Sequence, residues 1–170
     1  MIVLSEPKVA LIMGSNSDLP SLTGCISLLK SFGISVEAHV FSAHRTPEAA
    51  AAFAKSAREN GFSVIIGAAG KAAHLPGVLA AYTTLPVIGV PIKSSTLDGL
   101  DSLLSIVQMP KGIPVATVAI DGGDNAAILA AQIIALSYPC VAEKLLAHKE
   151  AMVQEVAEKD LALQSALSTI

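Results

Sequence analysis

Short apolar runs alternate with amphipathic stretches along the chain, an order typical of βαβ units built on a parallel sheet. The run Val9–Met13 contains only apolar residues and ends at Gly14, as expected of a strand buried on both faces. The same pattern predicts five strands in total, over Val9–Met13, Ser35–Phe41, Phe62–Gly67, Pro86–Val90 and Val115–Ile120.

Helices are predicted between these strands from apolar stripes and from residues that favour helix ends. Ser17 is the expected N-cap of the first helix, Thr46 supplies a capping hydroxyl before Pro47, and Asp124 is expected to cap a later helix. The predicted helices cover Asp18–Phe32, Thr46–Asn60, Ala72–Tyr82, Asp98–Gln108 and Asn125–Leu136, and a long helix follows Pro139.

Five strands with helices between them predict an α/β fold, a three-layer α/β/α sandwich around a doubly wound, flavodoxin-like parallel sheet. We expect a single domain over residues 1–170, with a core at 8–137 and an extra C-terminal helical tail at 139–168. Such sheets bind ligands at the carboxyl ends of their strands, near the reversal in strand order. Four segments fall at that edge, namely Gly14–Asp18, Ser42–Thr46, Ala68–Pro76 and Pro91–Ser95.

Charge is scarce and unevenly distributed, since hydrophobic residues make up 52% of the 170 residues and charged residues 15%. The longest uncharged run, Ala72–Ile92, contains three prolines, so no membrane-spanning helix is expected there. Only seven charged residues fall between Gly61 and Ala142, which would leave a monomer with a large apolar surface. We therefore expect a homo-oligomer with a solvated helical tail.

Several function classes lose support from the composition. A net charge of −3, two arginines and 4% aromatic residues provide no basic stripe or stacking surface, so no nucleic-acid partner is expected. Cys25 and Cys140 lie far apart, and no histidine or carboxylate motif indicates a metal site. The start of the sequence has neither a basic region nor a cleavage-like signal, so we expect a cytoplasmic protein.

The first strand-end loop, Gly14–Asp18, combines a glycine with small hydroxyls, which suits a bound phosphate. Asp18 suits the hydroxyls of a ribose or simple helix capping, and a capped helix start without a ligand remains an equal alternative. The Walker A, GxGxxG and GxSxG patterns are absent from the sequence. ATP hydrolysis, dinucleotide-linked hydride transfer and serine-hydrolase chemistry therefore lose support.

The second and third loops carry the candidate chemistry. Arg45 can hold a phosphate or carboxylate through paired hydrogen bonds, and the adjacent His44 can exchange protons near neutral pH. A purely structural role for His44 is the alternative. The third loop is rich in small residues, and its His74 is either a second polar contact or a hydrogen-bonding residue at a helix start. His39 and His148 are expected to be structural.

Five motifs share their order and spacing with one family: GSNSD (14–18), SAHRTPE (42–48), AAHLPG (72–77), SIVQMPKGIPVAT (105–117) and NAAILAAQI (125–133). Over residues 8–137 the chain resembles the class I N5-carboxyaminoimidazole ribonucleotide mutases of de novo purine synthesis. The resemblance implies a homo-octamer that acts on a small-molecule nucleotide, with no metal and no organic cofactor. It also implies functional coupling to the ATP-dependent enzyme that forms the substrate's carbamate.

The resemblance implies interconversion of 5-carboxyamino-1-(5-phospho-D-ribosyl)imidazole and 5-amino-1-(5-phospho-D-ribosyl)imidazole-4-carboxylate. His44 matches the family's general acid/base, and Ser15, Asp18 and Arg45 match its substrate-binding positions. Lys71 stands where glycine is common in the family. The pocket wall is expected to include Ser17, Ser42, Ala43, Gly70, Lys71, Ala72, Ala73, His74 and Leu75. Two alternatives are a direct CO2-dependent aminoimidazole ribonucleotide carboxylase and a non-catalytic flavodoxin-like module that binds nucleotide phosphates.

Overall fold

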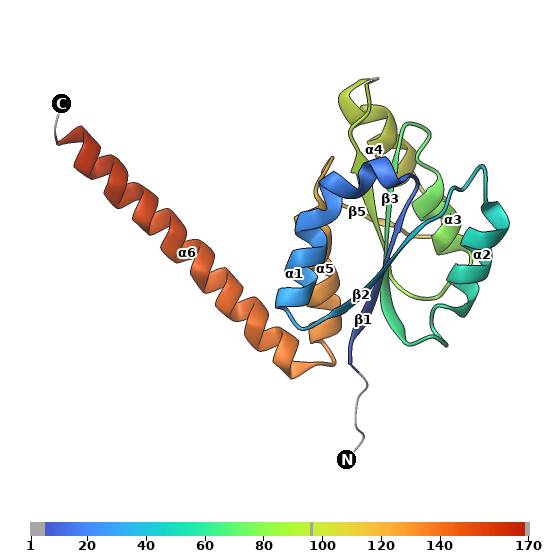
Figure 1. Cartoon of the computed structure of the whole chain (residues 1–170), viewed down its shortest axis with the longest axis horizontal. Coiled ribbons are helices and arrows are strands. Elements are labelled where there is room, and N and C mark those ends of the chain that lie inside the picture. The colour runs from blue at the N-terminus through green and yellow to red at the C-terminus, as the bar shows by residue number, and fades with distance from the viewer. Residues whose placement is uncertain (1–5, 96, 169–170) are drawn as a thin grey trace, which may run out of the picture.

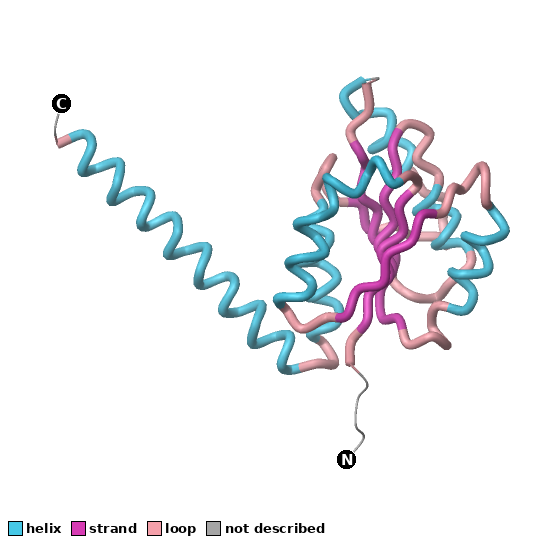
Figure 2. Tube along the Cα trace, in the orientation of Figure 1, coloured by secondary structure: helices cyan, strands magenta, loops and turns pink. Residues whose placement is uncertain are grey.

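A computed structural model describes residues 6–95 and 97–168 of the chain. These residues form a sheet of five parallel strands in the order β2-β1-β3-β4-β5 (Figure 2). The reversal in strand order lies between β1 and β3, so the doubly wound sheet predicted from the sequence is confirmed. The strands are β1 (Lys8–Met13), β2 (Ser35–Val40), β3 (Phe62–Gly70), β4 (Val87–Ile92) and β5 (Ala116–Thr117). The first five residues, on which the expected compartment rests, lie outside the described ranges.

Helices cover both faces of the sheet and complete three layers (Figure 1). The helices are the 3-10 helix η1 (Asn16–Leu22), α1 (Thr23–Ser31), α2 (Pro47–Ser56), α3 (Leu75–Ala81), the 3-10 helix η2 (Leu97–Gly99), α4 (Leu100–Val107), α5 (Gly123–Ala135) and α6 (Pro139–Leu167). Helices α1 and α5 cover one face, and α2, α3 and α4 cover the other. This arrangement confirms the expected α/β/α sandwich.

Strand β1 lies in the middle of the core, as its unbroken apolar sequence predicts. Leu11 faces the layer of α1 and α5, Ile12 faces the layer of α2 and α3, and both are fully buried. Burial of each such side chain contributes roughly 1.5–3 kcal/mol to folding. The ends of β1 are therefore held firmly, including the end that leads into Gly14.

The first helix differs from the prediction of one continuous helix over Asp18–Phe32. The chain instead forms η1, which contains Pro20, and regular α-helix begins only at Thr23. Proline lacks the N–H needed for an α-helical hydrogen bond, which favours tighter 3-10 winding there. The cap is Ser15 and not Ser17, because the Ser15 hydroxyl accepts from the Ser17 N–H at 3.3 Å.

Strands β3 and β5 differ in length from the prediction. Strand β3 continues to Gly70, so α3 begins at Leu75 and not at Ala72. Strand β5 has only two residues instead of the predicted six. The cause is Pro91 on the neighbouring strand β4. Its C=O points toward β5 and accepts a hydrogen bond from the Asp121 N–H. Its nitrogen carries no proton, so it cannot donate the hydrogen bond that a longer β5 would need.

Three other expectations about helix ends were wrong. Helix α2 stops at Ser56, where the Ser56 hydroxyl accepts from the Asn60 side chain at 3.2 Å. Helix α5 has Gly122 as its N-cap, and Asp124 lies in the first turn without capping. Thr46 precedes α2 but makes no capping hydrogen bond to it.

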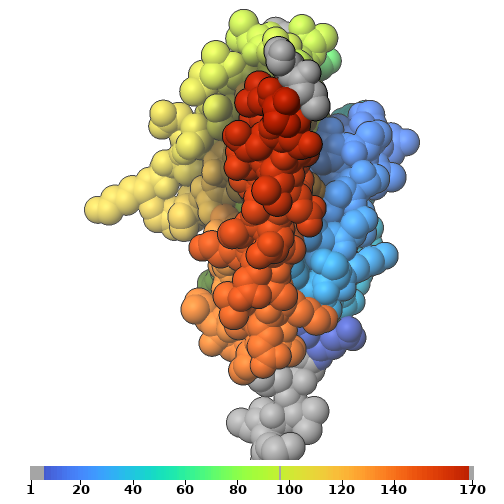
Figure 3. All heavy atoms as spheres, turned by 90° about the vertical axis from the view of Figure 1, so that its left-hand side faces the viewer, coloured from blue at the N-terminus to red at the C-terminus, as the bar shows by residue number. Residues whose placement is uncertain are grey.

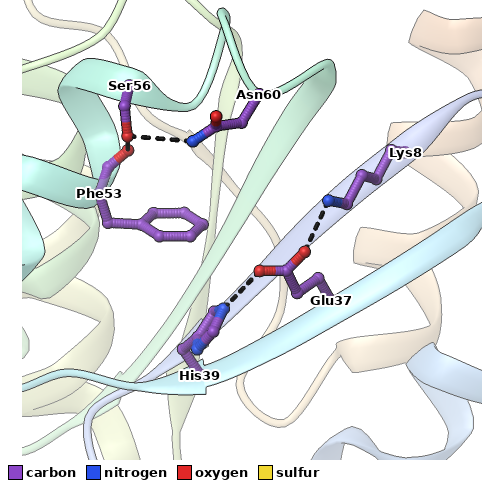
Figure 4. Close-up of polar contacts among 6 residues, drawn as sticks. All are labelled: Lys8, Glu37, His39, Phe53, Ser56 and Asn60. Atoms are coloured by element: carbon purple, nitrogen blue, oxygen red, sulfur yellow. Dashed lines mark hydrogen bonds and ion pairs between the residues drawn. The ribbon is translucent and has the colours of Figure 1, made fainter.

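Strand β2 forms one edge of the sheet and carries a charged cluster (Figure 4). Glu37 lies between Lys8 at 2.6 Å and His39 at 2.7 Å. The hydrogen bond from Lys8 and then that from His39 lower the pKa of the Glu37 carboxyl below its usual value. His39 also stacks on Phe41 with ring centroids 5.4 Å apart, which supports the structural role expected for it.

Helix α6 contacts the rest of the molecule near its start and then runs away from it (Figure 1), and Figure 3 shows the helix uncovered on the side toward the viewer. Val141 is fully buried in the core shared with α5, and His148 packs edge-on against Phe32 at 5.5 Å. Beyond this point the apolar side chains of the helix are exposed, including Met152, Val153, Val156, Leu161 and Leu163. No helix within residues 6–95 and 97–168 is long and apolar enough to cross a membrane.

Candidate functional site

The carboxyl ends of β1, β2, β3 and β4 surround a cavity of about 640 Å3, within the ~300–1,000 Å3 range of small-molecule sites. It lies at the reversal in strand order, where the sequence placed it. Twelve residues predicted for the site line this cavity: Ser15, Ser17, Asp18, Ser42, Ala43, His44, Arg45, Gly70, Lys71, Ala72, His74 and Leu75. Ala73 does not, because its methyl group is buried in the core beneath.

The first loop is organised by a reciprocal pair of hydrogen bonds. The Ser15 hydroxyl accepts from the Ser17 N–H, and the Asp18 carboxylate accepts from the Ser15 N–H at 3.2 Å. The Ser17 hydroxyl also donates to Ser15 Oγ at 2.8 Å. Of the two roles expected for Asp18, the structure shows the capping contact.

Asp18 is unusual because its side chain is buried at the cavity floor, with 9% of the residue exposed. Burial raises the pKa of its carboxyl, and the nearby Asp121 adds a smaller effect in the same direction. Hydrogen bonds from the Ser17 hydroxyl and the Ser15 N–H oppose this shift without cancelling it. Ionised Asp18 is thus held where its charge is poorly solvated.

Two histidines from distant parts of the sequence meet on the cavity wall. His44 Nε2 lies 2.8 Å from His74 Nδ1, with the ring planes inclined by 68°. One nitrogen must donate and the other must accept, so this contact holds one proton between the two rings. We call these residues the histidine pair. The sequence did not predict that His74 contacts His44, because no short motif spans the thirty residues between them.

Helices α3 and α4 lie close to the sheet because β3 and β4 carry a glycine where each helix packs. Gly67 and Gly89 are register partners on β3 and β4. A Cβ atom on Gly67 would lie 3.2 Å from Pro76 Cα, and one on Gly89 would lie 2.4 Å from Ile106 Cγ2. The close approach brings His74, just before α3, to within hydrogen-bonding distance of His44.

The charges around the cavity favour an anionic ligand. Arg45, Lys71 and Lys93 supply three cations, against the single carboxylate of Asp18 among the described lining residues. Lys93 also pairs with Asp98 at 3.3 Å, but both side chains are largely exposed, so this ion pair is weak. A phosphate is the kind of group that such a wall attracts.

Lys71 adopts a left-handed backbone conformation with φ of 57°. Glycine adopts this conformation without strain, so the glycine that the resemblance implies to be common here would fit the same backbone. Lys71 adopts this conformation at an energetic cost that a residue with a Cβ atom carries and glycine does not. It adds a cation at the cavity rim.

Five lining residues were not named as site residues, although all of them lie in the strand-end segments expected from the sequence: Gly14, Ala69, Ile92, Lys93 and Ser94. The signal for the last three was their position at the end of β4 and just after it, within the segment 91–95 that the strand-end rule had marked. Within the described part of the chain, no group of three or more His, Cys, Asp or Glu side chains is arranged to hold a metal ion.

A flavodoxin-like sheet whose switch-point cavity carries a histidine pair and cationic side chains defines an α/β enzyme of small anionic molecules. Comparison with known proteins gives the family. The family model described as AIR carboxylase matches residues 8–155, and the chain belongs to this family.

Relatives match over nearly their whole length. The N5-carboxyaminoimidazole ribonucleotide mutase of Pyrococcus abyssi is 58% identical over 152 residues, covering 89% of this chain and 87% of the relative. The protein of the same name from Thermotoga maritima is 57% identical over 153 residues, covering 90% of each chain. The crystal structure of Treponema denticola PurE superimposes with a TM-score of 0.83 at 31% identity, covering 92% of this chain and 98% of that one. The resemblance noted from the sequence motifs is therefore confirmed.

Proposed function

We propose that the chain is an isomerase of purine biosynthesis that converts 5-carboxyamino-1-(5-phospho-D-ribosyl)imidazole to 5-amino-1-(5-phospho-D-ribosyl)imidazole-4-carboxylate. The observation that carries the proposal is the histidine pair, whose nitrogens lie 2.8 Å apart on a cavity wall that Arg45 also lines. The mutase names of relatives up to 58% identical agree with it.

The cavity offers separate places for the two ends of this substrate. Arg45 and the hydroxyls of Ser15 and Ser17 bind the phosphate, since they join a cation to neutral donors. The imidazole ring then lies toward the histidine pair and the apolar side chain of Leu75. Binding the phosphate, which does not react, orients the ring for the step that follows.

His44 serves as acid and then as base. Protonated His44 donates to the exocyclic nitrogen of the carbamate, the N–C bond breaks, and its electron pair stays on that nitrogen as CO2 leaves. The enamine-like C4 carbon attacks CO2, and a C–C bond forms. Neutral His44 then removes the C4 proton, so the aromatic ring is restored and no net acid or base is consumed.

His74 suits the role of partner to this proton shuttle. A ring nitrogen 2.8 Å from His44 Nε2 can accept a hydrogen bond from one protonation state and donate to the other. The intermediate CO2 must stay beside C4, and small lining residues such as Gly70 and Ala72 leave room for it while limiting water.

We propose that the functional unit is a cytoplasmic homo-octamer. The scarcity of charge between Gly61 and Ala142 and the outward apolar side chains of α6 both support burial against neighbouring copies. Coupling to the ATP-dependent enzyme that supplies the carbamate follows from the lability of the substrate.

The test is turnover of the carbamate nucleotide by the purified protein without ATP. His44→Asn is expected to retain substrate binding and to lower kcat at least about 100-fold, the size of one general acid–base contribution. His39→Asn is the matched control, because His39 lies outside the cavity on β2, and it should keep wild-type turnover. Near-normal turnover by His44→Asn refutes the proton-shuttle role.

The same assay separates the two alternatives. A direct carboxylase would use aminoimidazole ribonucleotide with bicarbonate in preference to the carbamate nucleotide. A binding module would hold either nucleotide and turn over neither. The histidine pair favours catalysis over binding alone, because a phosphate-binding module has no use for a shared proton.

A further inference from the structure

The loop that carries His44 and Arg45 is closed by the side chains at its two ends. Between Ser42 and Thr46 the backbone makes one hydrogen bond, from Thr46 N–H to Ser42 O at 2.9 Å. The Thr46 hydroxyl accepts from the Ser42 N–H at 2.9 Å and donates to Ser42 O at 3.2 Å. The Ser42 hydroxyl in turn accepts from the Arg45 N–H at 3.2 Å. We call this segment the Ser42–Thr46 turn.

The Thr46 hydroxyl does not have the role that its place before Pro47 predicts. A threonine in this position usually caps the helix that follows, yet Thr46 makes no side-chain hydrogen bond to α2. Its hydroxyl instead points back to Ser42 and uses both its donor and its acceptor there. The side chain thus acts on the loop and not on the helix.

Both ends of the turn are attached to rigid elements. Phe41 N–H donates to Met13 O at 3.0 Å, which fixes the start of the turn to the end of β1. Pro47 fixes the other end, because its ring restricts φ at the first position of α2. Between these anchors the hydrogen bonds of the Ser42–Thr46 turn decide where its middle residues lie.

From this geometry we infer that Thr46 is a positioning residue, whose hydroxyl holds His44 against His74 and Arg45 at the cavity wall. The expected effect of Thr46 on the rate rests on the proposed function. The expected effect of Thr46 on the position of His44 and Arg45 rests on the contacts alone. A reacting group displaced by about 1 Å can lose about 100-fold in rate. Loss of the hydroxyl should act on turnover in this way.

Stability should hardly respond to the same change. Thr46 is exposed, so water can replace the lost hydrogen bonds to the backbone of Ser42. A capping threonine would behave differently, since its removal weakens the helix itself. Rate and stability therefore separate a positioning role from a capping role.

The experiment compares Thr46→Val with Thr46→Ser in the full-length protein. Valine keeps the shape and loses the hydroxyl, and serine keeps the hydroxyl. Thr46→Val is expected to lower kcat for the carbamate nucleotide about 10- to 100-fold and to raise KM through Arg45, with Tm within about 2 °C of wild type. Thr46→Ser is expected to stay within about threefold of wild type, allowing for the lost methyl contact.

Thr83→Val is the matched control. Its hydroxyl accepts from the Leu85 N–H at 3.1 Å, a local bond of the same kind outside the cavity, and its removal should leave kcat unchanged. A second readout does not depend on turnover: the imidazole nitrogen signals of His44 and His74 in NMR spectra. Thr46→Val should shift both signals and weaken their mutual hydrogen bond, while Thr46→Ser should leave them as in wild type.

Each outcome decides a different question. Wild-type turnover and imidazole signals in Thr46→Val overturn the inference, as does a Thr46→Ser variant that is as impaired as Thr46→Val. A fall in Tm that accounts for the lost activity also overturns it, in favour of capping. A wild-type protein that leaves the carbamate nucleotide unchanged while Thr46→Val still shifts both imidazole signals refutes the proposed function and keeps the positioning role.

Discussion

Asp18 combines two opposing demands in one side chain. Its carboxylate caps η1 through the Ser15 N–H, while burial withdraws the charge from water and raises the pKa of the carboxyl above its ordinary 3.8. A raised pKa means that the folded protein binds the proton more tightly than the unfolded chain does. Asp18 therefore favours folding at low pH, and this contribution is lost as the pH rises through the folded-state pKa.

Asp18→Asn is expected to raise Tm by about 2 °C at pH 7, because asparagine still accepts from the Ser15 N–H but carries no buried charge. The gain should shrink as the pH falls and vanish below 3.8, where the carboxyl is protonated in both states. Thermal unfolding at a series of pH values measures this. Destabilisation at pH 7 would show that the charge is worth more to the start of η1 than burial costs.

At the scale of residues, the sequence indicated which side chains gather at the site but not how they contact one another. His44 and Arg45 stood out because a strand end and a proline flank them. Which serine caps η1 and where the Thr46 hydroxyl points depend on backbone angles that no motif specifies. The histidine pair joins two loops and was therefore invisible to local spacing.

At the scale of elements, the facing glycines of β3 and β4 set the distance between the sheet and two helices. Gly67 receives Pro76 of α3, and Gly89 receives Ile106 of α4 together with Val115. Ile106 is fully buried and branched, so it has little room to move aside. A side chain at either glycine would push a helix outward.

Gly89→Ala is therefore expected to lower the free energy of unfolding by about 1–3 kcal/mol, the usual cost of overpacking a core. The new Cβ would lie 2.4 Å from Ile106 Cγ2 and 2.9 Å from Val115 Cγ1. Gly14→Ala is the control, because its Cβ would meet no atom closer than 3.8 Å and should change stability by less than about 0.5 kcal/mol. Chemical denaturation measures both; equal stability of the two variants would contradict the packing argument.

The sequence predicted the order and type of every strand and of six helices, because apolar periodicity is a property of each segment alone. The errors occur where contacts with an adjacent strand set the length of an element. Strand β5 stops early because Pro91 belongs to the adjacent strand, and β3 runs on to Gly70 because β4 pairs with it as far as Ile92. Pro20 was visible in the sequence, but the sequence did not show that the residues around it form the 3-10 helix η1.

At the scale of the whole molecule, α6 is the feature that one copy does not explain. Its first turn enters the core through Val141, but further along Val156 is 65% exposed and Leu163, on the same side of the helix, is 55% exposed. A helix of 29 residues with an outward apolar side is typical of a contact between copies. The proposed octamer would cover this side.

Val156→Asp is expected to dissociate the assembly, because it places a charge in a buried apolar contact. Gln154→Asp adds the same charge two residues away, on the opposite side of α6, and should leave the assembly intact. Sedimentation velocity should give the wild type and Gln154→Asp the mass of eight copies of 17.3 kDa, about 138 kDa. A wild type that sediments at 17.3 kDa, or a Val156→Asp variant of unchanged mass, contradicts the role of α6.

The shortness of β5 has a consequence for how copies can meet. Exposed strand edges can recruit further strands and seed aggregation, and short or charged edges oppose this. One border of this sheet offers only Ala116–Thr117. The other border is β2, which carries Glu37 and His39, and Lys8 of the adjacent strand β1 pairs with Glu37 there. Neither border therefore favours pairing with a strand of another chain. Contact between molecules is therefore left to helical surfaces, where a symmetric arrangement of copies can close into a finite assembly.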